Sequence, residues 1–447
     1  MNKIAAICGK YIFNRINYLC FFVIYLSFRF LLNDGNERIT QMIFFMYSFG
    51  FLLYRVINKK INIFDRKYFF GYFLVISGLI TILINKKNDF IGFRAIAMYI
   101  INFILLMNID DIKDINKEIK IIVSLILVLC TLHSVVSFFG FVTDRIGLTN
   151  LGFYNYGRLN GIIYLTYTGE IALIGIGSSI YLLLSDKIVK FRSLLILSIV
   201  ANFVVMFLTQ SRCSIYGFVF CLFLLIVLNV YLYGTKKIII NSILFSLAFI
   251  IIVSIFVYIS ARFEIINLRK IGIYSSGRLS LWKAFLAVFK KQNIVFGMGP
   301  SRFVEVYRHQ LADNGLPAFI DFFKDENLAA MYFKDAKFFT QLLTHSEYLR
   351  QLILFGIVGL SIFLVFIMYV LKYLVYMILC LKKYVKFEYL VVFYVIYPLF
   401  SALAENMFSI TNSPRHITSF TFFYLAPYII SIVMNERGNN TDGLQHS

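Results

Sequence analysis

The feature that most constrains this chain is a series of continuous apolar runs, each about as long as a helix that crosses a bilayer. A membrane-spanning helix needs roughly 20 consecutive apolar residues. A spanning β-strand would instead alternate apolar and polar residues, and these runs do not alternate. We therefore predict an all-α polytopic membrane protein with about 12 transmembrane helices. The runs centre on residues 16–33, 39–57, 68–84, 92–109, 120–142, 169–185, 193–209, 213–233, 238–260, 350–381, 388–405 and 415–434.

Composition excludes the soluble classes of protein. Hydrophobic residues make up 60% of the 447-residue chain and charged residues 15%, whereas soluble domains have roughly 45–50% and 25%. Secreted enzymes, disordered scaffolds and soluble nucleic-acid binders are therefore excluded. The net charge of +20 is attributed to cytoplasmic loops, which collect Lys and Arg, and no nucleic-acid partner is predicted. The six cysteines form no CxxC pair, so neither a disulfide framework nor a metal site is expected.

Lys and Arg in the short loops set the expected orientation. With the N-terminus inside, the cytoplasmic segments carry more than twice as many of these residues as the short outer loops. The connection between the third and fourth runs, with Lys86, Lys87 and Arg94, is the main exception. Both termini are thus predicted to be cytoplasmic. Residues 1–447 are predicted to form a single integral membrane domain, and residues 261–349 a large extracytoplasmic loop of short helices between spans nine and ten.

The large loop has one segment with a helical pattern. Ser276 could cap a helix that lies on the bundle or on the membrane surface. Apolar residues recur three and four positions apart along its face. They are Leu279, Trp282, Phe285, Leu286 and Phe289.

Charged groups near membrane depth are the first candidates for function. Arg212 lies in a tight turn, Thr209-Gln210-Ser211-Arg212, between two apolar runs. Its guanidinium suits bidentate contact with phosphate, although an interfacial arginine that only snorkels is the plainer alternative. Arg278 stands near the start of the amphipathic helix, where backbone N–H groups favour an anion; a solvated loop charge is its alternative.

A histidine and a further arginine complete the candidate set. His345 precedes the tenth run, and an imidazole outside the membrane can accept and release a proton; taken alone, the residue is more simply read as structural. Glu347 and Arg350 follow it and could set its protonation or pair with each other. Arg158 begins Arg158-Leu159-Asn160-Gly161, ahead of tyrosines that would stack on sugars or form an interfacial belt. Glu170 and Glu405, at span ends, are lesser candidates.

These motifs, taken in order, resemble the O-antigen ligase/polymerase superfamily of bacterial envelope glycosyltransferases, the Wzy-type polymerases and WaaL-like ligases. The resemblance covers about residues 150–370. Cys213 and Ser346 depart from the residues common in that family, and the Asn-Pro-Asn-like stretch after Arg-Leu-x-Gly is absent. The motifs are Arg158-Leu159-Asn160-Gly161, Thr209-Gln210-Ser211-Arg212, Gly277-Arg278 with Trp282, Asn293-Ile294-Val295-Phe296-Gly297-Met298-Gly299, His345-Ser346-Glu347-Tyr348-Leu349 and Phe355-Gly356-Ile357-Val358-Gly359.

The resemblance implies a metal-independent, inverting transfer of a glycan from undecaprenyl diphosphate to an acceptor hydroxyl, at the outer face of the bacterial cytoplasmic membrane and without a cofactor. His345, Arg278 and Arg212 would be catalytic, and Arg158, Glu347 and Tyr348 would bind substrate beside the two arginines. A capsular or O-antigen polymerase is the preferred interpretation. An O-antigen ligase is the close alternative, and a flippase for lipid-linked oligosaccharides is the alternative from another class. The implied partners are lipid-linked glycans, membrane lipid, and flippase and chain-length regulator proteins.

Overall fold

Helices form nearly all of the chain that the structure, a computed structural model, describes. Described are residues 14–28, 34–84, 90–110, 112, 114–150, 152–155, 158–161, 165–185, 191–233, 282–283, 285–286, 289–290, 293–299, 346–380, 387–403 and 417–444. The elements are α2 (Arg15–Phe28), α3 (Asp34–Ile57), η3 (Arg66–Tyr68), α4 (Phe69–Ile84), α5 (Phe90–Met107), α6 (Ile115–Arg145), β1 (Tyr154–Asn155), β2 (Arg158–Leu159), α7 (Leu165–Ser185), α8 (Arg192–Leu208), α9 (Arg212–Tyr233), α17 (Glu347–Cys380), α18 (Phe387–Val391), the π-helical turn η4 (Val392–Ile396), α19 (Tyr397–Ser401) and α20 (Ile417–Leu444).

The prediction of an all-α polytopic membrane protein is confirmed. Within the described residues, 7 helices are long and apolar enough to cross a membrane, and four shorter apolar helices lie beside them. Each of these segments falls on one of the predicted runs. The ninth run, 238–260, lies outside the described residues, so the total of twelve spans stays a prediction. The predicted loop at 261–349 is described only in small parts.

Helix α7 lies at the centre of one half of the molecule and packs against α6, α8, α9, α18, η4 and α20. Small residues on α7 allow this close approach. A Cβ at Gly177 would lie 2.3 Å from the ring of Phe393, and one at Gly175 would lie 2.8 Å from the side chain of Asn202. Asn202 itself accepts a hydrogen bond from Ser134 of α6, at 2.7 Å. Apolar packing and buried polar contacts together fix α7 between its neighbours.

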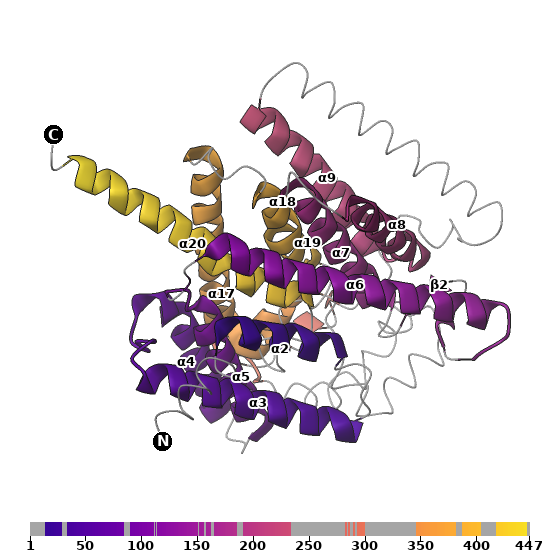
Figure 1. Ribbon diagram of the computed structural model, residues 1–447. Helices are drawn as coiled ribbons and strands as arrows, with labels where there is room; N and C mark the ends of the chain where they lie inside the picture. The colour runs from indigo at the N-terminus through magenta and orange to yellow at the C-terminus, as the bar shows by residue number, and fades with distance from the viewer. Residues whose placement is uncertain are drawn as a thin grey trace, which may run out of the picture.

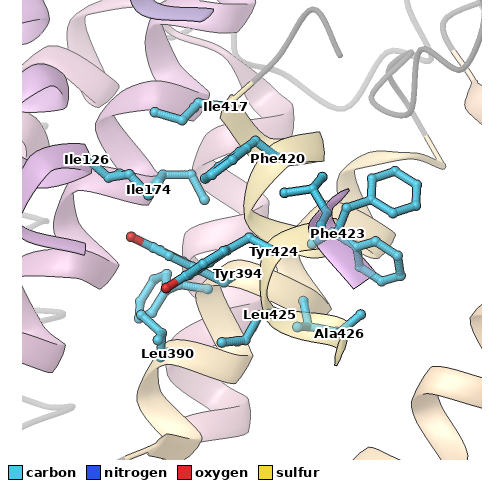
Figure 2. Packing of buried hydrophobic residues seen from close by; sticks show 14 of the residues in the cluster. Ile126, Ile174, Leu390, Tyr394, Ile417, Phe420, Phe423, Tyr424, Leu425 and Ala426 are labelled. Atoms are coloured by element: carbon cyan, nitrogen blue, oxygen red, sulfur yellow. The ribbon is translucent and has the colours of Figure 1, made fainter. Parts of the chain in front are cut away.

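Buried aromatic side chains join the C-terminal helices to this core. Phe420, Tyr424 and Tyr428 of α20 are fully buried. Figure 2 shows Phe420 and Tyr424 on the face of α20 that meets Ile174 of α7 and Tyr394 of η4. Ser178 of α7 and Tyr394 share a hydrogen bond of 2.6 Å. The C-terminal segment is therefore an integral part of the bundle.

The charged groups at the two ends of α6 belong to separate clusters. At its N-terminal end, buried Glu118 pairs with Arg15 of α2, their Oε1 and Nε atoms being 3.0 Å apart. Arg15 also donates to the carbonyl oxygens of Leu105 and Asn108, each at 2.6 Å, where α5 ends. At its C-terminal end, α6 meets the β1–β2 hairpin (Figure 1). We call this second end of the bundle the site end.

The amphipathic pattern predicted within 261–349 agrees with the structure at Phe285 and Phe289 but not at Leu286, which was predicted on the apolar face and is exposed. Phe285 and Phe289 are buried, whereas Lys283, Leu286 and Lys290 are exposed. Residues 282–283 and 285–286 are helical. The buried phenylalanines show that this face packs on the protein. Ser276 and Leu279 lie outside the described residues.

Candidate functional site

The Arg-Leu-Asn-Gly motif forms the second strand of a small hairpin. β1 and β2 are antiparallel, with Tyr154 opposite Leu159 and Asn155 opposite Arg158. The hairpin is attached to the end of α6, because the backbone N–H of Phe153 donates to Oδ2 of Asp144 at 2.6 Å. Leu159 is fully buried beneath it. The backbone of Arg158 is thus fixed at the site end, while its side chain is not among those described.

Gly161 ends this motif in a conformation that requires glycine. Its φ is +75°, and a Cβ there would lie 2.2 Å from Oγ1 of Thr168. The same Oγ1 donates to the carbonyl oxygen of Asn160 at 3.2 Å. The hairpin is therefore joined directly to the first turn of α7.

The Thr-Gln-Ser-Arg motif forms the turn between α8 and α9. Thr209, Gln210 and Ser211 are buried, and Gln210 has the left-handed φ of 52°. Thr209 Oγ1 donates to the carbonyl of Met206 at 2.7 Å and accepts from the N–H of Ser211 at 3.2 Å. Arg212, which is partly exposed, is the first residue of α9. The rigid turn thus holds Arg212 at a defined place.

The turn packs against the start of α7. A Cβ at Gly169 would lie 2.6 Å from Oγ of Ser214 and 2.9 Å from Oγ1 of Thr209. Only glycine allows this approach without displacing its neighbours. Glu170, the next residue, is 1% exposed and accepts a hydrogen bond from Oγ of Ser401 at 3.1 Å.

Ser401 and Ala402, at the end of α19, join the remaining segments. The Sγ of Cys213, beside Arg212, lies 3.0 Å from Oγ of Ser401. The N–H of Glu347, the first residue of α17, donates to the carbonyl oxygen of Ala402 at 2.8 Å. The arginine turn and the His-Ser-Glu-Tyr motif therefore meet across two consecutive residues. Neither Ser401 nor Ala402 was predicted; the one signal was a pair of small residues near the end of an apolar run.

Glu347 and Tyr348 are held by the protein itself. Glu347 is fully buried; its Oε1 accepts from Gln351 Nε2 at 2.6 Å, and its Oε2 lies 3.8 Å from Nη1 of Arg350. The hydroxyl of Tyr348 donates to the carbonyl of Leu399 at 3.2 Å. These contacts orient the first turn of α17, which Ser346 caps by accepting from the N–H of Leu349 at 3.5 Å. That Glu347 and Tyr348 bind substrate stays a prediction.

The electrostatic character of the site end follows from its helix termini. α7, α9 and α17 all begin there, and the N-terminus of a helix favours an anion. α6, α8 and α19 end there. The N–H of Glu347 and the carbonyl of Ala402 already bind each other. The N–H of Ser214 in α9 donates to Oγ of Ser211 at 3.5 Å. Arg212 adds a full positive charge at the N-terminus of α9. Among the described groups at this end, which also include the buried carboxylates of Glu170 and Glu347, Arg212 is the one suited to bind an anion such as a diphosphate.

Two of the predicted catalytic residues, Arg278 and His345, lie outside the described residues. Of the six predicted site residues, Arg212, Glu347 and Tyr348 are brought to the site end, and Arg158 is brought there by its backbone. Among the residues described, no group of three or more His, Cys, Asp or Glu could hold a metal ion.

Comparison with known protein families gives a match that covers part of the chain. The family model described as O-antigen ligase matches residues 194–364. The matched segment contains the Thr209–Arg212 turn, Asn293–Gly299 and the beginning of α17. No curated protein matches the chain.

Proposed function

Because residues 194–364 carry the O-antigen ligase domain of the O-antigen ligase/polymerase superfamily, we propose that this membrane protein is a glycosyltransferase that acts on lipid-diphosphate-linked glycans. The donor would be a repeat-unit oligosaccharide on undecaprenyl diphosphate. The acceptor would be a hydroxyl of another lipid-linked repeat unit. The product is then a capsular or O-antigen polymer.

One observation carries this proposal: three motifs that are distant in sequence meet at one end of the bundle. The 158–161, 209–212 and 346–350 segments converge on residues 168–170 and on Ser401-Ala402. Each motif alone is short. Their convergence beside Arg212 and three helix N-termini supports a site for a lipid diphosphate.

The proposed chemistry is a single displacement at the anomeric carbon. The acceptor oxygen forms the new bond, the bond to the diphosphate oxygen breaks, and the electron pair leaves with the diphosphate. The acceptor proton passes to His345 or, where His345 only positions the acceptor, to the leaving diphosphate. Arg212 and Arg278 bind the diphosphate, whose negative charge grows as the bond breaks, so their hydrogen bonds strengthen in the transition state. Arg158 supplies a further diphosphate or sugar contact.

In this proposal Glu347 also helps to position His345, through the contacts that the structure describes. Gln351 and Arg350 occupy its carboxylate, and its N–H is bound to Ala402. Since His345 stands two residues earlier in the chain, these contacts would position the histidine relative to the arginine turn. We further propose that the site end faces the outside of the cytoplasmic membrane, and both termini the cytoplasm.

The size profile of envelope glycans tests the proposal. Lipid-linked intermediates of a deletion strain would be separated by length, and the same strain complemented with the wild-type protein would show whether normal product returns. In the deletion strain without complementation, single repeat units on the outer face, without polymer, are expected for a polymerase. Complete polymer that remains on its lipid carrier would instead indicate a ligase, the activity named in the family description. Repeat units trapped inside the cell would indicate a flippase and refute the proposed chemistry.

His345→Ala is expected to lower the transfer rate about 10²–10⁴-fold, because a positioned general base contributes roughly that factor. Binding of the lipid-linked donor should be unchanged. Both would be measured on the purified protein, and His309→Ala serves as the control histidine in the same predicted loop. An equal loss of binding and of turnover would show that His345 is not the base.

A further inference from the structure

The longest described helix, α17, is interrupted nine residues after its start. Gly356 has φ 67° and ψ −167°, far from helical values. A break in a helix leaves backbone N–H and C=O groups without their helical partners. Within a membrane such groups must be satisfied by protein or by an enclosed polar site.

Residues 293–299 satisfy these groups. The N–H groups of Met298 and Gly299 donate to the carbonyl oxygens of Ile353 and Leu354, at 3.0 and 2.9 Å. In return, the N–H groups of Ile357 and Val358 donate to the carbonyls of Ile294 and Val295, at 3.0 and 3.1 Å. We call residues 293–299 and 353–358 together the backbone clamp.

Two glycines make the clamp possible. Gly297 has φ +73°, and a Cβ there would lie 2.5 Å from the backbone N of Gly356. A Cβ at Gly356 would lie 2.2 Å from the carbonyl oxygen of Val295. In both cases the obstructing atoms belong to the backbone and cannot rotate away. Any larger residue at either position must therefore push apart the two segments of the clamp, residues 293–299 and 353–358.

Further contacts attach the clamp to the bundle. Oγ1 of Thr81 in α4 donates to the carbonyl oxygen of Phe296 at 2.6 Å. The side chain of Asn293 accepts from the N–H groups of Val295 and Phe296, each at 3.1 Å. Just before the clamp, Phe285 and Phe289 are buried. Residues 293–299 thus have a defined position against α4 and α17.

We propose that Gly297 and Gly356 are positioning residues for glycan transfer, a role that rests on the function proposed above. The clamp joins the chain that follows Arg278 to the helix that begins two residues after His345. Through the backbone it sets how these two segments stand relative to each other. Neither glycine would touch the substrate.

Gly297→Ala and Gly356→Ala test the proposal, with Gly147→Ala as the matched control. Gly147 has a comparable φ of +77°, but a Cβ there would meet nothing within 4 Å. The control therefore also places a Cβ on a residue with positive φ, but without separating any segments. We expect the clamp variants to transfer glycan about 10²-fold more slowly, the scale of a misplacement of about 1 Å. Donor binding should stay near that of the control, whereas the thermal midpoint should be lower, because the clamp variants lose backbone hydrogen bonds that the control keeps.

Trypsin cleavage after Lys283 and Lys290, both exposed, gives a readout that does not depend on activity. Faster cleavage in the clamp variants than in Gly147→Ala is expected. Unchanged cleavage would refute the clamp, and faster cleavage with unchanged transfer would refute its positioning role. A third outcome is that the wild-type protein transfers no glycan although the clamp variants are cleaved faster than Gly147→Ala. That result would refute the proposed function but would still support the structure of the clamp.

Thr81→Val decides the matter if the glycine variants do not fold. It removes the hydrogen bond to Phe296 and adds no bulk to the clamp. Slower transfer by a folded Thr81→Val protein would support the proposal. Wild-type transfer by a Thr81→Val protein that trypsin cleaves faster than the wild type would overturn it.

Discussion

Replacing Arg212 with alanine is expected to lower glycan transfer about 10²–10³-fold, the effect of removing one preorganised donor that binds developing charge. The side chain begins α9 and follows a buried turn, so its position does not depend on the substrate. The protein should still insert and fold. Arg212→Lys should also be impaired, because an ammonium cannot replace the planar, bidentate guanidinium.

Arg192→Ala is the matched control for this variant. Arg192 begins α8 as Arg212 begins α9, but at the opposite end of this antiparallel pair, and it is exposed. Transfer would be measured with purified protein and lipid-linked donor, and polymer length in complemented cells. Polymer of normal length in cells that carry Arg212→Ala would show that Arg212 is not part of the site.

Replacing Arg15 with methionine is expected to destabilise the protein by about 3–5 kcal/mol, the usual cost of removing one partner of a buried ion pair. Arg15 is 8% exposed and Glu118 is 4% exposed, so the remaining carboxylate would be left without its cation. The carbonyls of Leu105, Leu106 and Asn108, which Arg15 now binds, would also lose a donor. The N-terminal helix would then separate more easily from α5 and α6.

The double variant Arg15→Met/Glu118→Met separates the loss of the pair from the cost of the unpaired charge. It should be less destabilised than the two single variants summed, because no buried charge then remains. Lys67→Met is the control, since Lys67 pairs with Asp110 at side-chain exposures of 22% and 56%; exposed pairs contribute about 0–1 kcal/mol. Unfolding of the detergent-solubilised proteins would be compared. If Arg15→Met lowered the free energy of unfolding by less than Lys67→Met does, the prediction for Arg15 would be contradicted.

The helices could be predicted from the sequence because each depends on a local property. Roughly 20 apolar residues in a row satisfy both the length of the bilayer and the need to form backbone hydrogen bonds within the segment. α4, α9 and α20 accordingly begin within about three residues of the predicted runs. The break at Gly356 could not be predicted in this way, because Phe355-Gly356-Ile357 reads as ordinary apolar helix.

The sequence by itself determined the class of protein, the apolar runs and the short motifs that carry Arg158, Arg212 and Glu347. Tertiary structure alone decided that these motifs meet on Gly169 and Ser401, and that Gly297 faces Gly356. The reason is physical. Burial of apolar residues in a bilayer depends on composition within one segment, whereas the meeting of motifs depends on how helices pack, through small residues whose partners lie far away in the chain.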